Sequence, residues 1–498
     1  MTAKPFAPFL LSILSGALLA LSLPPYDLSF LAWFVLVPLL LAAKTEDRTL
    51  EIAGRGLLVG LIAGTIHARF SGGLFLVFAY LPFAWFGVLC AIFAVASHQL
   101  RHEKPLTRVA MLACVGVASE WLTTLTPLPI NFAVTQYRVL DLIQIADITG
   151  IWGVSFLLWF ANAAIANAII SRREPLSRRA AVAPLAISLL SVFAAFVYSS
   201  FRLYQPQTTK TIRVAAVQAF EPNGAHGFAD AVSTDSKLRE SLTRNAVAQG
   251  ARLVVWSEET LGSDFQPRKN DDATRQLARQ LGTTIVAGWM EENDAKQWNS
   301  AALVAPNGDV ASVHRKIHLY AGERSSTTAG TTPTVIDTDL GKIGIAICFD
   351  TCWTNVLRAE TKNGAQIIAM PNFDPPVPRG VVHFLHGAML PFRAVENRVP
   401  IVRADPNGHS GVVTAQGRVL DSRPLQRADV SVRDVFLGYG KPTFFARFGD
   451  WLAWTCVLIT AISSVILLRR ALLSRQLSHK KQDTDFIHGK ARIDTDQN

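Results

Sequence analysis

The chain has 498 residues, of which half are hydrophobic and only 17% are charged, and its mean hydropathy is +0.26. This composition is too apolar for an ordinary soluble protein and indicates membrane-spanning segments. The net charge of +10 is explained by positive residues that flank the apolar runs, which argues against a nucleic-acid partner, and five cysteines are too few for a disulfide framework.

Long apolar runs fill residues 1–203 and return at 450–470. Since about 20 apolar residues cross a bilayer, we expect a membrane domain of about seven helices over 1–203 and a last helix over 450–470. The expected spans are 6–23, 29–44, 54–70, 73–98, 108–125, 147–171, 180–201 and 451–468. No small-x-small cleavage site follows the first run, so we expect an uncleaved helix there rather than a signal peptide.

Lysine and arginine residues in the short loops predict the orientation. They gather after the second, fourth, sixth and eighth runs, for example in SRREPLSRR at 171–179. These loops and both termini are therefore expected in the cytoplasm of a bacterium, with the chain embedded in its inner membrane. Residues 210–445 are expected on the periplasmic side. The basic, polar tail 471–498 is expected to be a disordered cytoplasmic segment.

Residues 210–445 have the pattern of a soluble α/β domain. The apolar runs TIRVAAVQAF (211–220) and ARLVVWSEET (251–260) predict strands, and DSKLRESLTRNAVAQGA between them predicts a helix with Asp235 as its N-cap. A second helix is expected to end at Gly282, and a further one to cover 383–397. Strands that alternate with helices in this way predict sheets covered on one face by helices.

Three reactive side chains follow apolar strands of this domain. Glu258 follows the strand of VVWSEET, Lys316 follows that of SVHRKIHLY, and Cys348 lies in IAICFD. A thiol is mostly protonated at neutral pH, a carboxylate can accept its proton, and an ammonium group can stabilise an oxyanion. Cys348 alone would more often be a buried structural residue, and Lys316 alone a solvated one, but the three together form a set suited to acyl transfer.

In this order and context the three residues resemble the nitrilase, or carbon–nitrogen hydrolase, superfamily. With the apolar runs, the chain resembles the membrane branch of that superfamily, the apolipoprotein N-acyltransferases. The likeness covers almost the whole chain and includes three membrane segments and AGERSS at 321–326. The membrane segments are LSLPPYDLSFLAWFVLVPLL (21–40), EWLTTLTPLPINFAVTQ (120–136) and LIQIADITGIWGVSFLLWFANA (142–163).

The resemblance implies a helical membrane domain joined to an α-β-β-α sandwich. It implies that Glu258, Lys316 and Cys348 are catalytic, with Glu323 as a second essential carboxylate. It also implies transfer of an acyl chain from a phospholipid, through a Cys348 thioester, to the N-terminal amine of an apolipoprotein. The chain departs from the family pattern at WSEE, at CFD and at PNFDPPVPRG (371–380), whose loops are expected to line the site.

Two other functions remain open: a membrane-anchored amidase that uses water as acceptor, and a catalytically silent membrane scaffold. Several residues near the three also have two interpretations. Glu259 is expected to point away from Glu258, because side chains alternate along a strand, and Glu323 could instead form a surface salt bridge. We expect Asp350 to hydrogen-bond the backbone near Cys348, and Cys352 to serve in packing, although a Cys348–Cys352 disulfide would block the thiol.

We expect no cofactor and no metal. Two histidine pairs, His314 with His318 and His383 with His386, have spacings that occur in metal sites. Neither pair has a matching third-ligand motif, so hydrogen-bonding or solvated histidines are the favoured interpretation.

Overall fold

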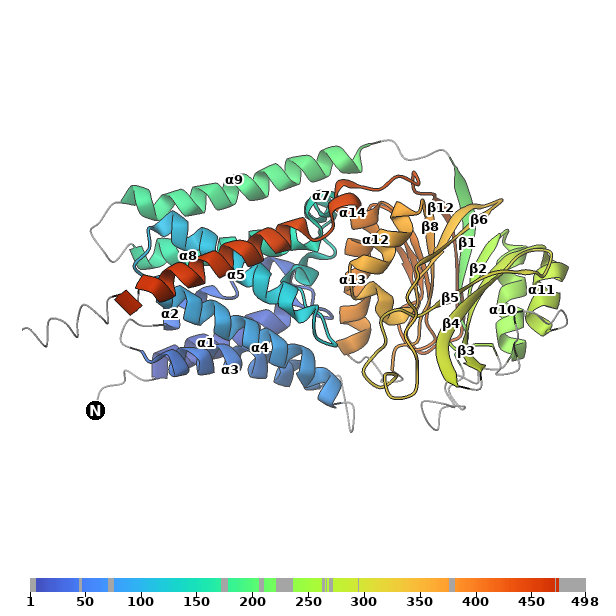
Figure 1. Ribbon diagram of the computed structural model, residues 1–498, viewed down its shortest axis with the longest axis horizontal. Helices are drawn as coiled ribbons and strands as arrows, with labels where there is room; N and C mark the ends of the chain where they lie inside the picture. The colour runs from blue at the N-terminus through green and yellow to red at the C-terminus, as the bar shows by residue number, and fades with distance from the viewer. Residues whose placement is uncertain are drawn as a thin grey trace, which may run out of the picture.

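The computed structural model has a helical half and a two-sheet half that lie end to end (Figure 1). The predicted N-cap Asp235, part of the divergent loop (376–380) and the tail 471–498, apart from two helical residues, lie outside the described residues. The residues that the structure describes are 6–43, 47–69, 76–171, 178–205, 210–220, 236–261, 265, 267, 272–293, 295–375, 381–470 and 472–473.

The helical half contains the expected apolar segments. Six helices of the described chain are long and apolar enough to cross a membrane, and two shorter apolar ones accompany them. The short ones are α1 (Phe6–Ser22) and the broken segment Ser29–Ala42, which ends in α2 (Val37–Ala42). The long ones are α3 (Thr49–Ala68), α4 (Leu76–Gln99), α5 (Pro105–Thr123), α8 (Ile151–Ser171), α9 (Arg178–Leu203) and Trp451–Arg470.

The sixth expected span, 147–171, is shorter than the sequence suggested. A separate turn of helix, α7 (Ala146–Thr149), precedes α8, and the two are divided by Gly150 with φ of +66°. This left-handed conformation favours glycine and ends a helix. The apolar pattern runs on through the break because both pieces are buried.

A buried carboxylate joins the helices that face the two-sheet half. Glu120 of α5 accepts hydrogen bonds from the Ser155 hydroxyl (2.7 Å) and the Trp159 indole (2.6 Å) of α8. It also accepts one from Asn131, which directly precedes the 3₁₀ helix Phe132–Gln136. A polar group inside a membrane protein needs such partners, and these bonds hold the segment around Asn131 in place.

The two-sheet half consists of two six-stranded sheets. The first has the order β12-β1-β2-β3-β4-β5, with bounds Asp429–Phe436, Thr211–Gln218, Leu253–Val255, Thr284–Asn293, Lys296–Val304 and Val310–Arg315. The second has the order β11-β10-β9-β8-β7-β6, with bounds Val419–Ser422, Gly411–Val413, Ile401–Ala404, Ile367–Pro371, Gly341–Ile345 and Thr334–Thr338.

Apolar cores on both faces of each sheet confirm the α-β-β-α sandwich. One core lies between the sheets. A second lies under α10 (Ser236–Ala248) and α11 (Ala273–Leu281), and a third under α12 (Asn355–Lys362) and α13 (Val381–Asn397). Helix α11 ends as predicted, with Gly282 in the left-handed conformation.

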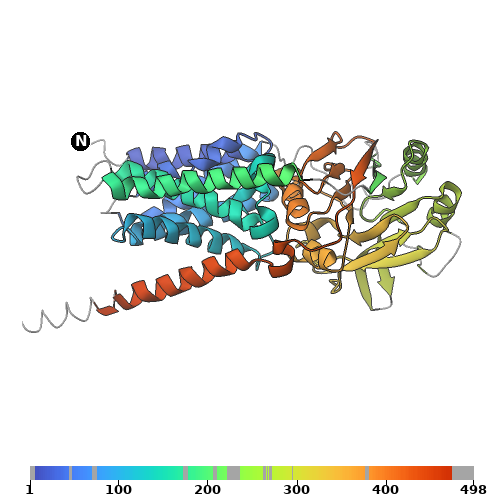
Figure 2. The same ribbon diagram turned by 90° about the horizontal axis from the view of Figure 1, so that it is seen from above.

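Helix α13 connects the two halves of the molecule. Its Leu390 and Ala394 pack on the second sheet, whereas Met389 and Phe392 pack in the core of the helical half. Figures 1 and 2 show α13 between the membrane helices and the sheets. Side chains that extend from the second sheet toward α13 therefore lie at the junction between membrane and sandwich.

Candidate active site

Glu258, Lys316 and Cys348 follow β2, β5 and β7. Strand β2 is parallel to β1 and β3, and β7 is parallel to β8. Strand β5 is antiparallel to β4, which is antiparallel to β3, so β5 runs in the same direction as β2 and β3. Because the carboxyl ends of strands that run the same way meet at one edge of a sheet, Glu258 and Lys316 lie at one edge. A backbone contact from Glu258 to Asn372, just after β8, brings the corresponding edge of the second sheet against it.

Lys316 is the centre of a buried group of polar side chains. Its Nζ lies 2.8 Å from Glu258 Oε1 and 2.8 Å from Glu323 Oε1. Asn299 of β4 donates to both carboxylates, at 2.8 Å in the case of Glu323. Lys316 is only 2% exposed and Glu258 4%. We call Glu258, Asn299, Lys316 and Glu323 the Lys316 cluster.

Burial makes Glu258 an unusual carboxylate. Loss of solvation raises its pKa to about 7, and the positive charge of Lys316 only partly opposes this. Burial alone would lower the pKa of Lys316, but the charges of Cys348, Glu258 and Glu323 raise it well above the ordinary value. Glu258 Oε2 has no hydrogen-bond partner among the described residues. Glu258 can thus exchange a proton near neutral pH while Lys316 stays charged.

Cys348 stands at a sharp turn after β7. Its backbone φ is +45°, a value that is strained for a residue with a side chain, and such strain is concentrated at functional sites. Burial raises the pKa of its thiol well above the usual value; Glu258 adds to this effect and Lys316 opposes it. Cys348 and Cys352 are both free thiols. The Cys348 side chain is therefore a buried, protonated thiol under the influence of the Lys316 cluster.

Asp350 ties the turn of Cys348 to the loop of Lys316. It accepts hydrogen bonds from the backbone N–H groups of Ile347 (3.0 Å), Ile317 (3.0 Å) and His318 (2.7 Å). His314 Nε2 lies 3.3 Å from Oδ2 of the same carboxylate. Burial would raise the pKa of Asp350, but His314 and these N–H groups lower it. The carboxylate fixes the relative position of the two loops.

One prediction about this region is wrong. Glu259 does not point away from Glu258: carboxylate oxygens of Glu258, Glu259 and Glu323 all lie within 4.8 Å of one another. Alternation fails because strand β2 already ends at Val255 and Glu259 has a φ of +55°. Three acidic groups at this spacing could hold a cation, and Lys316 already supplies a positive charge to two of them.

The four histidines have hydrogen-bond partners in the described chain. His314 contacts Asp350 and Thr334, and His318 contacts Asn355 and stacks on Trp353. His383 and His386 both contact one carboxylate, Asp374. Only His386 lies in a group with ligand-like spacing, in which one of its nitrogens, the Cys348 sulfur and an Asp374 oxygen are within 4.8 Å of one another.

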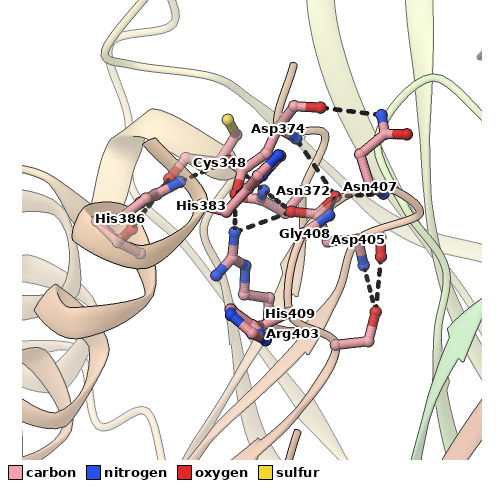
Figure 3. A network of polar contacts seen from close by, with 12 residues as sticks. Cys348, Asn372, Asp374, His383, His386, Arg403, Asp405, Asn407, Gly408 and His409 are labelled. Carbon is pink, nitrogen blue, oxygen red and sulfur yellow. Dashed lines mark hydrogen bonds and ion pairs between the residues drawn. The ribbon is translucent and has the colours of Figure 1, made fainter. Parts of the chain in front are cut away.

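A second buried polar group lies beside Cys348, and the sequence analysis did not identify it (Figure 3). Asp374 contacts His386 Nδ1 at 2.8 Å, His383 Nδ1 at 3.3 Å and Arg403 Nη2 at 2.6 Å. Arg403 also contacts Asp405 at 2.8 Å. We call Asp374, His383, His386, Arg403 and Asp405 the Asp374 cluster.

The signal for the Asp374 cluster was present in the sequence. The sequence AQIIAMPNFD contains the apolar run that forms β8, and Asp374 follows that strand as Cys348 follows β7. Arg403 and Asp405 lie within and just after β9. A charged residue inside an apolar strand needs a buried partner, so the arginine of VPIVRAD points to a neighbouring carboxylate.

A small apolar groove of about 60 Å³ lies beside these groups. On the membrane side its walls are α4 and residues 128–134, and on the other side they include Phe349, Cys352 and His386. The position of Cys352 in this wall agrees with a packing role. The groove leads from the membrane helices toward the turn that carries Cys348.

Both halves of the chain match known families. Residues 15–164 match the apolipoprotein N-acyltransferase N-terminal domain, and residues 213–443 match carbon-nitrogen hydrolase. Over 95% of its length, the chain is 31% identical to an apolipoprotein N-acyltransferase of Geobacter metallireducens, of which it covers 98%. The chain belongs to the apolipoprotein N-acyltransferase family.

A second relative has the same name. An apolipoprotein N-acyltransferase of Chlorobaculum tepidum is 23% identical over 92% of this chain and 96% of its own length. Among solved structures, an amidase from Nesterenkonia sp. has 22% identity and a TM-score of 0.39, over 50% of this chain and 99% of the amidase. As a member of the apolipoprotein N-acyltransferase family, the chain is a multi-pass membrane acyltransferase. The resemblance inferred from the motifs is confirmed.

Proposed function

We propose that the protein transfers an acyl chain from a phospholipid to the N-terminal amine of an apolipoprotein, with Glu258, Lys316 and Cys348 as catalytic residues. The observation that carries the proposal is the position of the Lys316 cluster. Its carboxylates and cation lie near the Cys348 thiol at one edge of the sandwich, next to an apolar groove whose membrane-side wall is α4 and residues 128–134. The donor's chains can remain in lipid while its ester reaches the thiol.

In the first step, Glu258 accepts the Cys348 proton and the sulfur attacks the ester carbonyl of the phospholipid. The free oxygen Oε2 and the raised pKa of Glu258 suit it to this role. Lys316 stabilises the oxyanion of the tetrahedral intermediate. The carbon–oxygen bond then breaks, and Glu258 returns the proton to the departing oxygen. The lysophospholipid leaves, and the acyl chain remains on Cys348 as a thioester.

In the second step, the amine of the lipidated N-terminal cysteine of the apolipoprotein attacks the thioester. Glu258 is ionised again and takes the proton from the amine. The carbon–sulfur bond breaks, Glu258 passes the proton to the departing sulfur so that the thiol of Cys348 is regenerated, and the acyl chain remains on nitrogen as an amide. Glu323 supports both steps as a second carboxylate on Lys316, and Asp350 holds the two loops together.

The positive-inside pattern supports an orientation in the bacterial inner membrane with both termini cytoplasmic and residues 210–445 periplasmic. In this arrangement residues 1–203 form the membrane domain, 450–470 the last membrane helix and 471–498 a cytoplasmic tail. The thiol then lies on the side of the membrane where exported lipoproteins are found.

Transfer from a labelled phospholipid to a synthetic diacylated lipopeptide tests this function. Purified protein in detergent should move the labelled chain to the peptide's α-amine, with release of one lysophospholipid per amide formed. A peptide with an acetylated α-amine is the matched control and should remain unlabelled. Label that appears only as free fatty acid would instead show the membrane-anchored amidase, and no turnover of lipid would indicate the silent scaffold.

A further inference from the structure

His386 lies between Asp374 and the turn that carries Cys348 (Figure 3). Its Nδ1 lies 2.8 Å from Asp374 Oδ1. Its Nε2 lies 3.2 Å from the backbone carbonyl oxygen of Cys348 and 3.1 Å from the hydroxyl of Thr351. The Thr351 hydroxyl donates its own proton to the same carbonyl, at 3.0 Å. Both ring nitrogens therefore face oxygen atoms.

These partners offer a hydrogen-bond acceptor to each ring nitrogen of His386. Asp374 is buried, yet Arg403 and His386 hold its pKa well below the usual range, so it is an ionised acceptor. A backbone carbonyl can also only accept. The Thr351 oxygen is free to accept from Nε2, because its proton is directed to Cys348. A ring that carries both protons would donate from both nitrogens, and each nitrogen of His386 faces an atom that can accept.

A proton on each nitrogen of His386 would matter for Cys348 because the sulfur is close. The Cys348 sulfur, an Asp374 oxygen and a nitrogen of His386 lie within 4.8 Å of one another. A carboxylate at that distance opposes formation of a thiolate, and a cation at the same distance offsets it. His386 and Thr351 also fix the backbone carbonyl of Cys348, a residue in a strained conformation with φ of +45°.

We propose that Asp374 and His386 form a charge-balanced pair that positions Cys348: Asp374 keeps His386 doubly protonated, and His386 holds the Cys348 carbonyl and cancels the Asp374 charge beside the sulfur. The pair acts through Cys348, so its importance for catalysis depends on the proposed role of that thiol. His386 is a positioning residue, distinct from the base Glu258 and the cation Lys316.

Other titratable groups also lie near His386 and Cys348. Beyond Asp374, Arg403 and Asp405 approach from β9 and the loop after it, and His383 lies on the same helix. The charges of Glu258 and Lys316 also act on Cys348. The groove wall formed by α4 and residues 128–134 contributes apolar side chains and Asn131.

The rate of Cys348 alkylation by iodoacetamide tests the pair without acyl transfer. The purified full-length protein is alkylated between pH 6 and 9, and mass spectrometry of the Cys348 peptide follows the product. His386→Gln keeps an amide N–H near the carbonyl but leaves Asp374 unbalanced, so we expect alkylation about tenfold slower, with its pH dependence displaced upward. His383→Gln, the matched control on the same helix, should slow it much less.

The double variant His386→Gln/Asp374→Asn decides between charge balance and a purely structural role. Charge balance predicts that the double variant reacts severalfold faster than His386→Gln alone, because the unbalanced carboxylate is gone. A double variant no faster than His386→Gln, or a His386→Gln variant with the wild-type rate, would overturn the proposal. Thermal unfolding in detergent checks that each variant is folded, and His386→Asn replaces His386→Gln if the latter is not.

Because alkylation needs no lipid, this result is independent of the acyl-transfer reaction. If the variants change the alkylation rate as expected but no thioester forms, the proposed function is refuted and the proposal of the pair stands. Thioester formation without these effects would refute the pair alone.

Discussion

The two polar clusters beside Cys348 are built from similar residues but hold protons very differently. In the Lys316 cluster, burial raises the pKa of Glu258 to about 7, and Oε2 of this carboxylate has no partner in the described chain. In the Asp374 cluster, Arg403 and His386 lower the pKa of Asp374 far below its usual range, and its oxygens are occupied. In the proposed mechanism the first cluster exchanges a proton during the reaction, whereas the second provides fixed charges that position the thiol.

Removal of the exchangeable proton acceptor should have the largest effect. We expect Glu258→Gln to slow thioester formation on Cys348 by about 10³-fold, because general-base catalysis contributes about 10²–10⁴-fold. Quench-flow with labelled phospholipid measures the rate. The proposed difference between the clusters would be contradicted if Glu258→Gln kept more than a tenth of the wild-type rate of thioester formation and Asp374→Asn reduced that rate more strongly.

The pH dependence should reflect Glu258 and not Asp374. Glu258 must be ionised to accept a proton, so below pH 7 the rate of thioester formation should fall about tenfold per pH unit, reaching about a hundredfold by pH 5. Asp374 stays ionised throughout this range and adds no further slope. A rate that is constant between pH 5 and 7, or one that falls about a hundredfold per pH unit, would contradict this assignment.

Glu323 shares Lys316 with Glu258 but is more exposed, so its loss should matter less. Glu323→Gln removes one charge-assisted bond to Lys316, and we expect thioester formation to slow about tenfold to a hundredfold. Glu323→Asp should recover part of the rate if the carboxylate itself is needed. Wild-type kinetics for Glu323→Gln would mean that the contact is only a salt bridge.

Asp350 belongs to neither cluster, and its substitution should have the smallest effect on chemistry. Asp350→Asn keeps the oxygen that accepts from Ile317 and His318, but it puts an NH₂ group where the other oxygen accepts from Ile347, and it loses the charge near His314. We expect about a tenfold loss of rate and a lower unfolding midpoint in detergent. The matched substitution Asp337→Asn on the edge strand β6 should change neither.

Sequence reasoning located Glu258, Lys316 and Cys348 because they follow apolar strands, and strands that run the same way present their ends at one edge. Glu323 came from the family resemblance, and Asn299, which lies inside β4, was not identified. The apolar runs likewise predicted the membrane segments. Other features depended on geometry that spacing does not encode. The break at Gly150 requires a backbone angle, the position of Glu259 requires knowledge of where β2 ends, and the Asp374 cluster unites residues from a loop, a helix and a strand.

The most direct test of the central claim is mass spectrometry of the purified protein after incubation with phospholipid alone. The account predicts one acyl adduct on Cys348 that hydroxylamine removes, present in Cys352→Ala and absent in Cys348→Ala. An adduct on another residue, an adduct that persists in Cys348→Ala, or consumption of phospholipid with no thioester at Cys348 would contradict it.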